Sequence, residues 1–205
     1  MGIFDIFRRR PPIRDASALA DFIDQNAAFV VQKGIYEYSR ARAGHYSKVL
    51  FSESAFRDAC DASRWRAYPL GLAMVGELAE GILRPARPED RPDQVNAIRL
   101  LVLGVFDRHP VHMGLGPEIW AELRGELERR LMLIGLHAPK WAKDVPEPYA
   151  EAYFNLMPIH EKLRGRDGMT VRNYLRVTMC NIHEDLAKRA DVPAVAQSLR
   201  ELTGA

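Results

Sequence analysis

The 205-residue sequence has little of several features that identify common classes of protein. Its two cysteines, Cys60 and Cys180, lie far apart in helix-like segments, which fits a reducing compartment better than a disulfide framework. No apolar run reaches the roughly 18 residues of a membrane-spanning helix, because arginine, glutamate or proline interrupts each long hydrophobic stretch. No segment alternates polar and apolar residues for long enough to indicate a β-sheet. We therefore expect a cytoplasmic protein that is soluble or peripheral to the inner membrane.

Neither sign of charge is in large excess, because the chain has 29 Lys and Arg, 27 Asp and Glu, and a net charge of +2. The two signs are interleaved after Arg14, which disfavours nucleic-acid binding through a large basic face. The chain lacks the Gly-x-Ser-x-Gly motif of serine hydrolases and the glycine-rich motifs that bind nucleotides. Its histidines have no second pair of ligands at a metal-binding spacing. We assign no catalytic residue, metal or cofactor from motifs.

The first ten residues are the most distinctive stretch that is present. Four large apolar side chains precede three consecutive arginines and the pair Pro11-Pro12. There is no apolar run of seven residues and the charge follows the apolar part, so we expect no cleaved secretory signal. We predict that residues 1–14 are a basic amphipathic segment that contacts an anionic membrane surface. The alternative is a tail that folds back onto its own domain. The predicted membrane contacts are Ile3, Phe4, Ile6, Phe7, Arg8, Arg9 and Arg10.

Residues 15–205 are expected to form one helical domain, because their apolar residues recur at helical spacing. Asp15 is a suitable N-cap for a long helix that reaches about Ala43. Further helices are expected over 53–61, 65–83, 95–106, 118–134, 149–163, 171–189 and 192–202. Counting the first two of these as a pair, we predict an all-α, bundle-like single domain of six to seven helices.

Serine and proline positions set the expected boundaries inside this domain. Ser63 is a candidate N-cap that separates a short helix from the strongly apolar helix over 65–83. Pro69 is expected to end the first turn of that helix or to kink it, and Pro158 to kink the helix over 149–163. We therefore expect separate helices on either side of Ser63 and one kinked helix around Pro158.

Aromatic and arginine side chains border the two proline-rich connections, over 84–92 and 137–148. Amphipathic rings at such positions often lie half exposed and can anchor a partner, although core packing is the alternative for each of them. Arginines beside them can pair with local acids or frame an interface. The candidate partner-binding residues are Arg64, Trp65, Tyr68, Trp141, Tyr149, Tyr153 and Phe154.

Several segments occur in a recognisable order: a FDIFRRRPP start, Arg64-Trp65 before AYPLGLAMVGELAEGIL, ELERRLMLIGL, EAYFNLM and a terminal NYLRVTMCNIHEDLA. Over roughly residues 36–200 this order resembles the ubiquinol-cytochrome c chaperone family, assembly factors that accompany newly made cytochrome b. The chain lacks that family's Gly-Val-Pro-Asp-Thr run and the histidine of its apolar helix. The resemblance implies a helical body and an assembly role without catalysis, and the missing run leaves the client open.

Together these features predict a non-catalytic accessory or chaperone protein that acts on a membrane-protein client, such as a respiratory-complex subunit, at the cytoplasmic membrane surface. Two alternatives stay open. One is a small helical enzyme that uses His183 and Glu184, or His160 and Glu161, as acid and base. The other is a homodimeric scaffold that buries its apolar helix over 65–83 between subunits.

Overall fold

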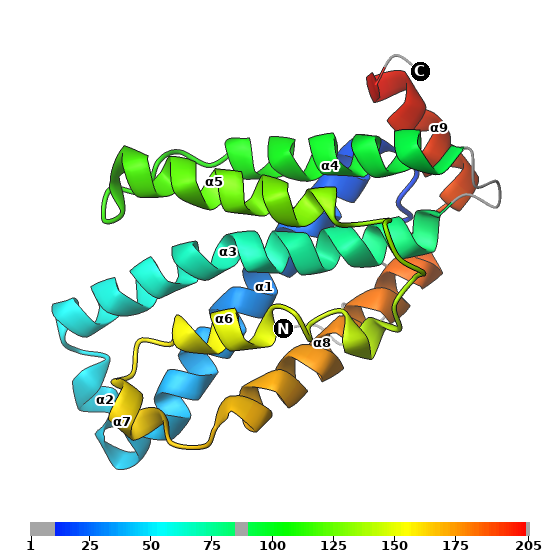
Figure 1. Cartoon of the computed structure of the whole chain (residues 1–205). Helices are drawn as coiled ribbons and strands as arrows, with labels where there is room; N and C mark the ends of the chain where they lie inside the picture. Colours follow the sequence, from blue (N-terminus) through cyan, green and yellow to red (C-terminus); the bar gives the residue numbers. More distant parts are fainter. Residues whose placement is uncertain (1–10, 85–89, 204–205) are drawn as a thin grey trace, which may run out of the picture.

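A 30-residue helix, α3 (Ser54–Leu83), runs through the middle of the computed structural model (Figure 1), which describes residues 11–84 and 90–203. Helices α4 and α5 lie along one side of it, α6 and α8 lie on the other, and α1 crosses behind it. Within the described ranges there is no β-strand, so the predicted all-α bundle is confirmed. The other helices are α1 (Ala16–Ala43), α2 (Ser47–Leu50), α4 (Arg91–Asp107), α5 (Gly116–Met132), α6 (Ala150–Asn155), α7 (Glu161–Arg164), α8 (Gly168–Arg189) and α9 (Val192–Thr203).

The first helix begins and ends where its sequence predicts. The Asp15 carboxylate accepts a hydrogen bond from the Ala18 N–H at 2.8 Å, which satisfies one of the free donors of the first turn. At the other end Gly44 adopts a φ of 52°, and its N–H bonds to the Arg40 carbonyl. Both signals are local, so the predicted boundaries of α1 are confirmed.

Helix α3 corrects the predicted break at Ser63. Ser63 lies inside the helix instead of capping one, and Pro69 is also in its interior. An interior proline costs about 3 kcal/mol relative to alanine, but every residue from Ala67 to Glu80 is buried. Packing on all sides of α3 therefore outweighs the local preference for a break. Because the helix is covered by its own chain, it needs no second copy to bury it, which corrects the argument for a homodimeric scaffold.

The segment around Pro158 differs from prediction in the opposite direction. In place of one kinked helix, two short helices, α6 and α7, are joined by irregular backbone. Proline has no N–H to donate and disfavours the helical conformation at the residue before it. The Arg164 guanidinium donates to the carbonyls of Phe154, Asn155 and Ile159 at 3.3, 3.1 and 2.7 Å, so it satisfies acceptors at the end of α6 and in the connection to α7.

The beginning of α1 is joined to the junction between α8 and α9 (Figure 1). The Ile13 N–H donates to the Arg189 carbonyl and the Asp191 N–H donates to the Ile13 carbonyl, both at 2.9 Å. Ile13 is only 1% exposed, and the Ser198 hydroxyl accepts from the Ala16 N–H at 3.1 Å. This connection fixes where residues before Pro11 leave the bundle.

Glycine 71 allows α1 and α3 to approach closely, which gives a test of the packing. A β-carbon there would lie 2.9 Å from the Ala27 carbonyl oxygen, whereas one at Gly104 on α4 would meet nothing within 4 Å. Gly71→Ala should lower the free energy of unfolding by about 1–3 kcal/mol. Gly104→Ala should raise it by about 0.5–1 kcal/mol, because alanine restricts the unfolded chain. Urea denaturation measures both, and equal effects would contradict the close approach.

Candidate functional site

Arg64, Trp65 and Tyr68, three of the residues predicted to bind a partner, lie together on α3. The Tyr68 hydroxyl donates to the Asp24 carboxylate at 2.6 Å, and its ring is only 2% exposed. The Arg64 guanidinium lies 5.0 Å from the Trp65 ring centroid and pairs with a carboxylate one turn earlier at 2.7 Å. The Trp65 ring also contacts the rings of His109, His112 and Trp120. Trp65 and Arg64 are half-buried edges of a packed aromatic cluster.

The remaining predicted partner residues do not join this cluster. Tyr149 and Tyr153 are 4% and 0% exposed, so they belong to the core, which corrects their assignment to a surface. Phe154 is half-buried, and Trp141 is 78% exposed. Trp141 lies near the second half of α3, roughly 20 Å along the helix from Trp65. The predicted partner-binding residues therefore do not form one surface. Trp65 and Trp141 lie near different connections of the chain.

The predicted membrane contacts, residues 3–10, lie outside the described residues. In the part of the chain that is described, none of the helices has the length and apolar character to cross a bilayer.

Two carboxylates inside α3 form a polar site that the sequence did not predict. Glu77 is 6% exposed and Glu80 only 1%. The Lys140 ammonium lies 2.7 Å from one Glu77 oxygen, and the Tyr149 hydroxyl donates to the other at 3.1 Å. Burial, together with the negative charge of Glu77, raises the pKa of Tyr149 above its usual value. A buried charge needs such partners, since an unpaired one is strongly destabilising.

Glu80 is paired by arginine. The Arg84 guanidinium donates to both Glu80 oxygens, at 2.8 and 2.5 Å, and Arg84 and Arg91 both donate to the His137 carbonyl, at 2.8 and 2.7 Å. These bonds attach the connection over 133–149 to α3 and α4. A cavity of about 290 Å³ lies beside them, with His183 and Trp141 among its lining residues.

The acid and base pairs of the enzyme alternative do not come together in this cavity. His183 borders it, but Glu184 pairs with Lys188 at 2.5 Å, and that ammonium holds the pKa of the Glu184 carboxyl below its usual value. His160 caps α7, where its ring nitrogen accepts from the Lys162 N–H at 3.3 Å. Among the described residues, no three His, Cys, Asp or Glu side chains are grouped to hold a metal ion. The cavity's buried charges are already paired with each other.

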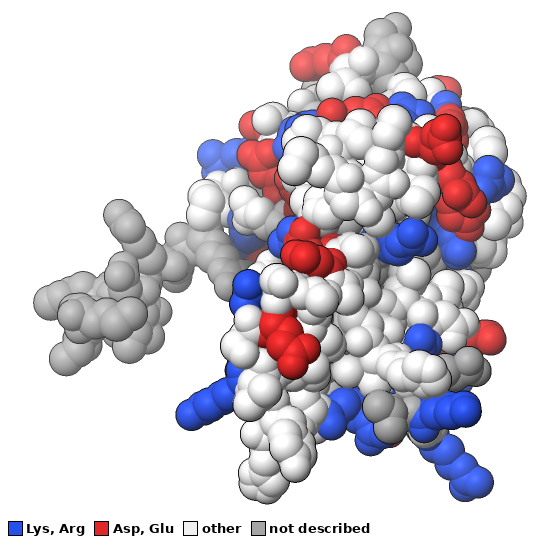
Figure 2. Space-filling model, turned by 90° about the vertical axis from the view of Figure 1, so that its left-hand side faces the viewer, with Lys and Arg blue, Asp and Glu red and all other residues white. Residues whose placement is uncertain are grey.

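The end of the molecule where α1 meets α2 and α7 is basic. From Arg40 to Ser52 the chain has three cations and no Asp or Glu. Lys and Arg side chains project from the lower edge of the space-filling view, which shows this end (Figure 2). Tyr46 and Val49, beside the cations, are 77% and 61% exposed. We call this region the basic end; it comprises Arg40, Arg42, His45, Tyr46, Lys48, Val49, Lys162 and Arg166.

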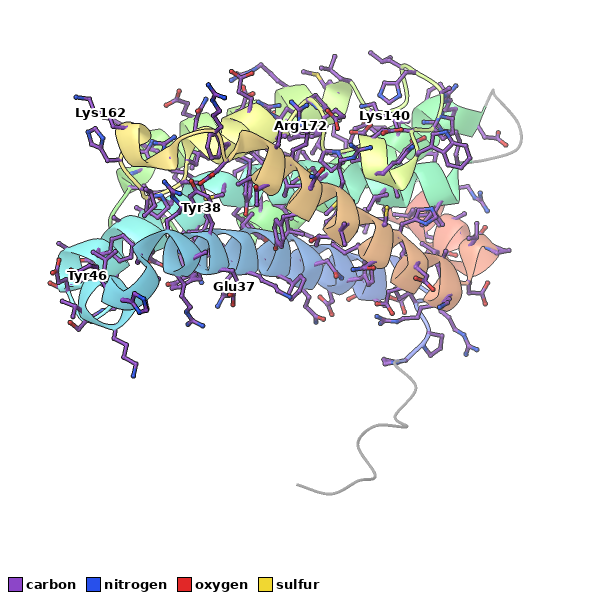
Figure 3. The ribbon with its side chains drawn as sticks, turned by 90° about the horizontal axis from the view of Figure 1, so that it is seen from below. Glu37, Tyr38, Tyr46, Lys140, Lys162 and Arg172 are labelled. Atoms are coloured by element: carbon purple, nitrogen blue, oxygen red, sulfur yellow. The ribbon has the colours of Figure 1, made fainter. Side chains whose placement is uncertain are left out.

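A groove of about 1210 Å³ lies between α1 and α8. In Figure 3 these two helices converge at the end where the described chain begins. Phe29 on α1 and Val177 on α8 are 48% and 62% exposed within the groove. Its other lining residues include Pro11, Pro12, Asp21, Phe22, Gln25, Asn26, Lys33, Asn173, Tyr174, Asn181, Ile182, Asp185 and Arg189.

The sequence has one feature that indicates this groove and that the sequence-based prediction did not include. Phe29 and Val177 each precede a buried residue, Val30 and Thr178, and so fall just off the buried stripes of their helices. A large apolar side chain beside an amphipathic stripe widens the apolar face beyond what one neighbouring helix covers. The packing of α1 against α8 leaves both side chains exposed in the same groove. This arrangement is a property of tertiary packing.

Tyr174, which lines the groove, bonds to the same carbonyl of α1 as the buried Tyr153. Tyr153 and Tyr174 donate to the Val30 carbonyl at 3.1 and 2.9 Å, respectively. Gly34 leaves them the necessary space, because a β-carbon there would overlap the Tyr153 hydroxyl. Burial raises the pKa of Tyr174 to about 12.

The raised pKa of Tyr174 predicts an alkaline loss of stability. An unfolded tyrosine titrates near 10, so the stability from the neutral hydroxyl is complete below that pH and is lost as pH rises toward 12. Tyr174→Phe should remove a share of this loss, up to about 3 kcal/mol. Urea denaturation at several pH values measures it. A pH dependence in Tyr174→Phe equal to that of the unmodified chain would contradict the assignment.

Comparison with known proteins does not indicate which of three regions is functional: the basic end, the groove between α1 and α8, or the cavity beside Glu77. No family model matches the chain, and neither a curated protein nor a solved structure is significantly similar to it.

Proposed function

We propose that the protein is a non-catalytic accessory protein that acts on a membrane-protein client at the cytoplasmic face of an anionic membrane. The observation that supports this best is the basic end, where cations surround exposed apolar side chains. Tyr46 and Lys162, from different segments, lie at the same end of the molecule (Figure 3). An aromatic ring among cations suits the boundary between lipid headgroups and acyl chains. Each cation near an anionic surface contributes about 1 kcal/mol.

Three cations of the basic end, Arg40, Arg42 and Lys48, lie at the surface of the molecule. Arg42 lies 3.3 Å from the Asp167 carboxylate, but both side chains are partly exposed, at 37% and 27%. Such a pair stabilises the fold by no more than about 1 kcal/mol. Arg40 and Lys48 are exposed. These side chains can therefore face anionic headgroups without disrupting the core.

Helix α1 sets the distance between the basic end and the predicted N-terminal membrane segment. Its 28 residues span about 42 Å, and Pro11, which follows the segment, lies beside the beginning of α1. Two weak contacts at opposite ends of a rigid helix reinforce each other, because the first raises the effective concentration of the second. This arrangement supports reversible attachment with α1 lying along the surface.

Vesicle binding tests the membrane part of the proposal. Replacing Arg40, Arg42 and Lys48 together by glutamine should weaken binding to anionic vesicles about 100-fold, since three contacts of about 1 kcal/mol are lost. The matched control replaces Arg99, Arg124 and Arg129, on α4 and α5, by glutamine and removes the same charge. Its binding should stay close to that of the unmodified chain in co-sedimentation. Equal losses in both variants would show a net-charge effect and contradict a specific basic end.

The client part of the proposal is supported by the segment order that resembles the ubiquinol-cytochrome c chaperone family, and by the exposed Trp141. Full-length protein purified from mildly solubilised membranes should enrich a respiratory-complex subunit, identified by mass spectrometry. Trp141→Ala should reduce that enrichment, whereas Met113→Ala, at a residue 98% exposed on the connection between α4 and α5, should not. Enrichment of no membrane protein by the full-length chain would overturn the client part.

A further inference from the structure

We propose that the groove between α1 and α8 binds the chain's own residues 3–10. The two prolines that follow this segment form one end of the groove. They are held there, because the Arg189 guanidinium donates to the Pro11 carbonyl at 3.0 Å and Ile13 is paired on both sides of its peptide. The segment therefore begins at the mouth of the groove, whatever direction it takes.

Length and volume suit this occupant. The groove follows α1 from Ala18 to Lys33, about 23 Å of helix, and the eight residues 3–10 reach about 26–29 Å when extended. Pockets for small molecules have volumes of about 300–1,000 Å³, whereas this one has about 1210 Å³ and is open along its length. A peptide segment fills such a groove better than a small ligand does.

The chemistry of the groove matches that of the segment. Phe29 and Val177 present exposed apolar surface, and the segment has four large apolar side chains. Two carboxylates and two cations line the groove, Asp21 and Asp185 with Lys33 and Arg189, so its match with the segment is apolar surface and not net charge. The Asp21 and Asp185 carboxylates accept from the Arg108 and Arg189 guanidinium groups at 2.7 and 2.9 Å.

Binding of the segment in the groove would regulate membrane attachment. This regulation rests on the proposed membrane function, whereas binding in the groove does not. The apolar side chains that would enter a bilayer are the same ones that the groove would cover. The two locations therefore compete, and an anionic surface shifts the population toward the released segment only through its greater affinity for it. The result is a protein that conceals its apolar segment away from a membrane.

Photo-crosslinking tests the docking in the full chain. Phe7 is replaced by benzoylphenylalanine, the protein is irradiated without vesicles, and the crosslinked peptides are mapped by mass spectrometry. We expect crosslinks to α1 near Phe29 and to α8 near Val177. A mixture of isotope-labelled and unlabelled chains shows whether they form within one chain. Crosslinks to another surface, crosslinks only between chains, or no crosslinks would each overturn the proposal.

A matched pair of variants on α8 separates this inference from the membrane function. Val177→Arg should lower the crosslink yield about tenfold by removing an apolar contact and repelling the arginines of the segment. Met169→Arg adds the same charge at a residue 59% exposed on the same helix but outside the groove, and should leave the yield unchanged. If the segment is also the membrane contact, Val177→Arg should bind anionic vesicles severalfold more tightly than Met169→Arg does.

The two failures are distinguishable. Groove crosslinks that respond to Val177→Arg, in a protein that binds no vesicles, would support the docking and reject the membrane function. Vesicle binding that is lost on deletion of residues 2–10, without groove crosslinks, would support the membrane function and reject the docking.

Discussion

The rest of the structure depends on covering α3 on every side. Every residue from Ala67 to Glu80 is buried, so a single amphipathic neighbour is not enough, and α1, α4, α5 and α8 all pack against it. Continuous burial keeps Pro69 inside a helix despite its local cost. It also requires close approach, which Gly71 provides where α1 crosses. The positions of the other helices, and therefore of the surfaces between them, follow from this requirement.

Placing two carboxylates within that buried stretch adds a second constraint. Lys140 pairs with Glu77, and Arg84 pairs with Glu80 and also donates to the His137 carbonyl, so the connection over 133–149 cannot be an independent loop. Replacing such a network by apolar residues is often neutral for stability, whereas removing one partner is costly. The pairs thus specify the path of the connection more than they stabilise the protein. They also explain why Tyr149, whose hydroxyl bonds to Glu77, lies in the core instead of on the predicted surface.

Local signals could be predicted from the sequence, and tertiary ones could not. Asp15 and Gly44 terminate α1 by contacts within a few residues, so periodicity and caps were sufficient there. Ser63 has the residue type of a cap, but burial of α3 by the helices around it decides its conformation. The groove needs α1 and α8, whose facing residues Phe29 and Val177 are 148 positions apart. Residue type alone does not show that Phe29 and Val177 are exposed whereas Tyr153 is buried. The exposure of each side chain depends on which helix lies opposite it.

The bridge at Ile13 links these constraints to function. It holds the start of α1 against the end of α8 and thereby fixes both the end of the groove and the point where the N-terminal segment leaves. Transfer of that segment between groove and membrane would therefore move only residues before Pro11 and would leave the bundle intact. No helix would have to unfold in this transfer. The equilibrium between groove and membrane would therefore depend on the difference in free energy between burying the segment's apolar side chains in the groove and burying them in the bilayer, together with the charge of the membrane surface. A small difference of this kind responds to lipid charge and ionic strength, which suits reversible attachment better than permanent anchoring.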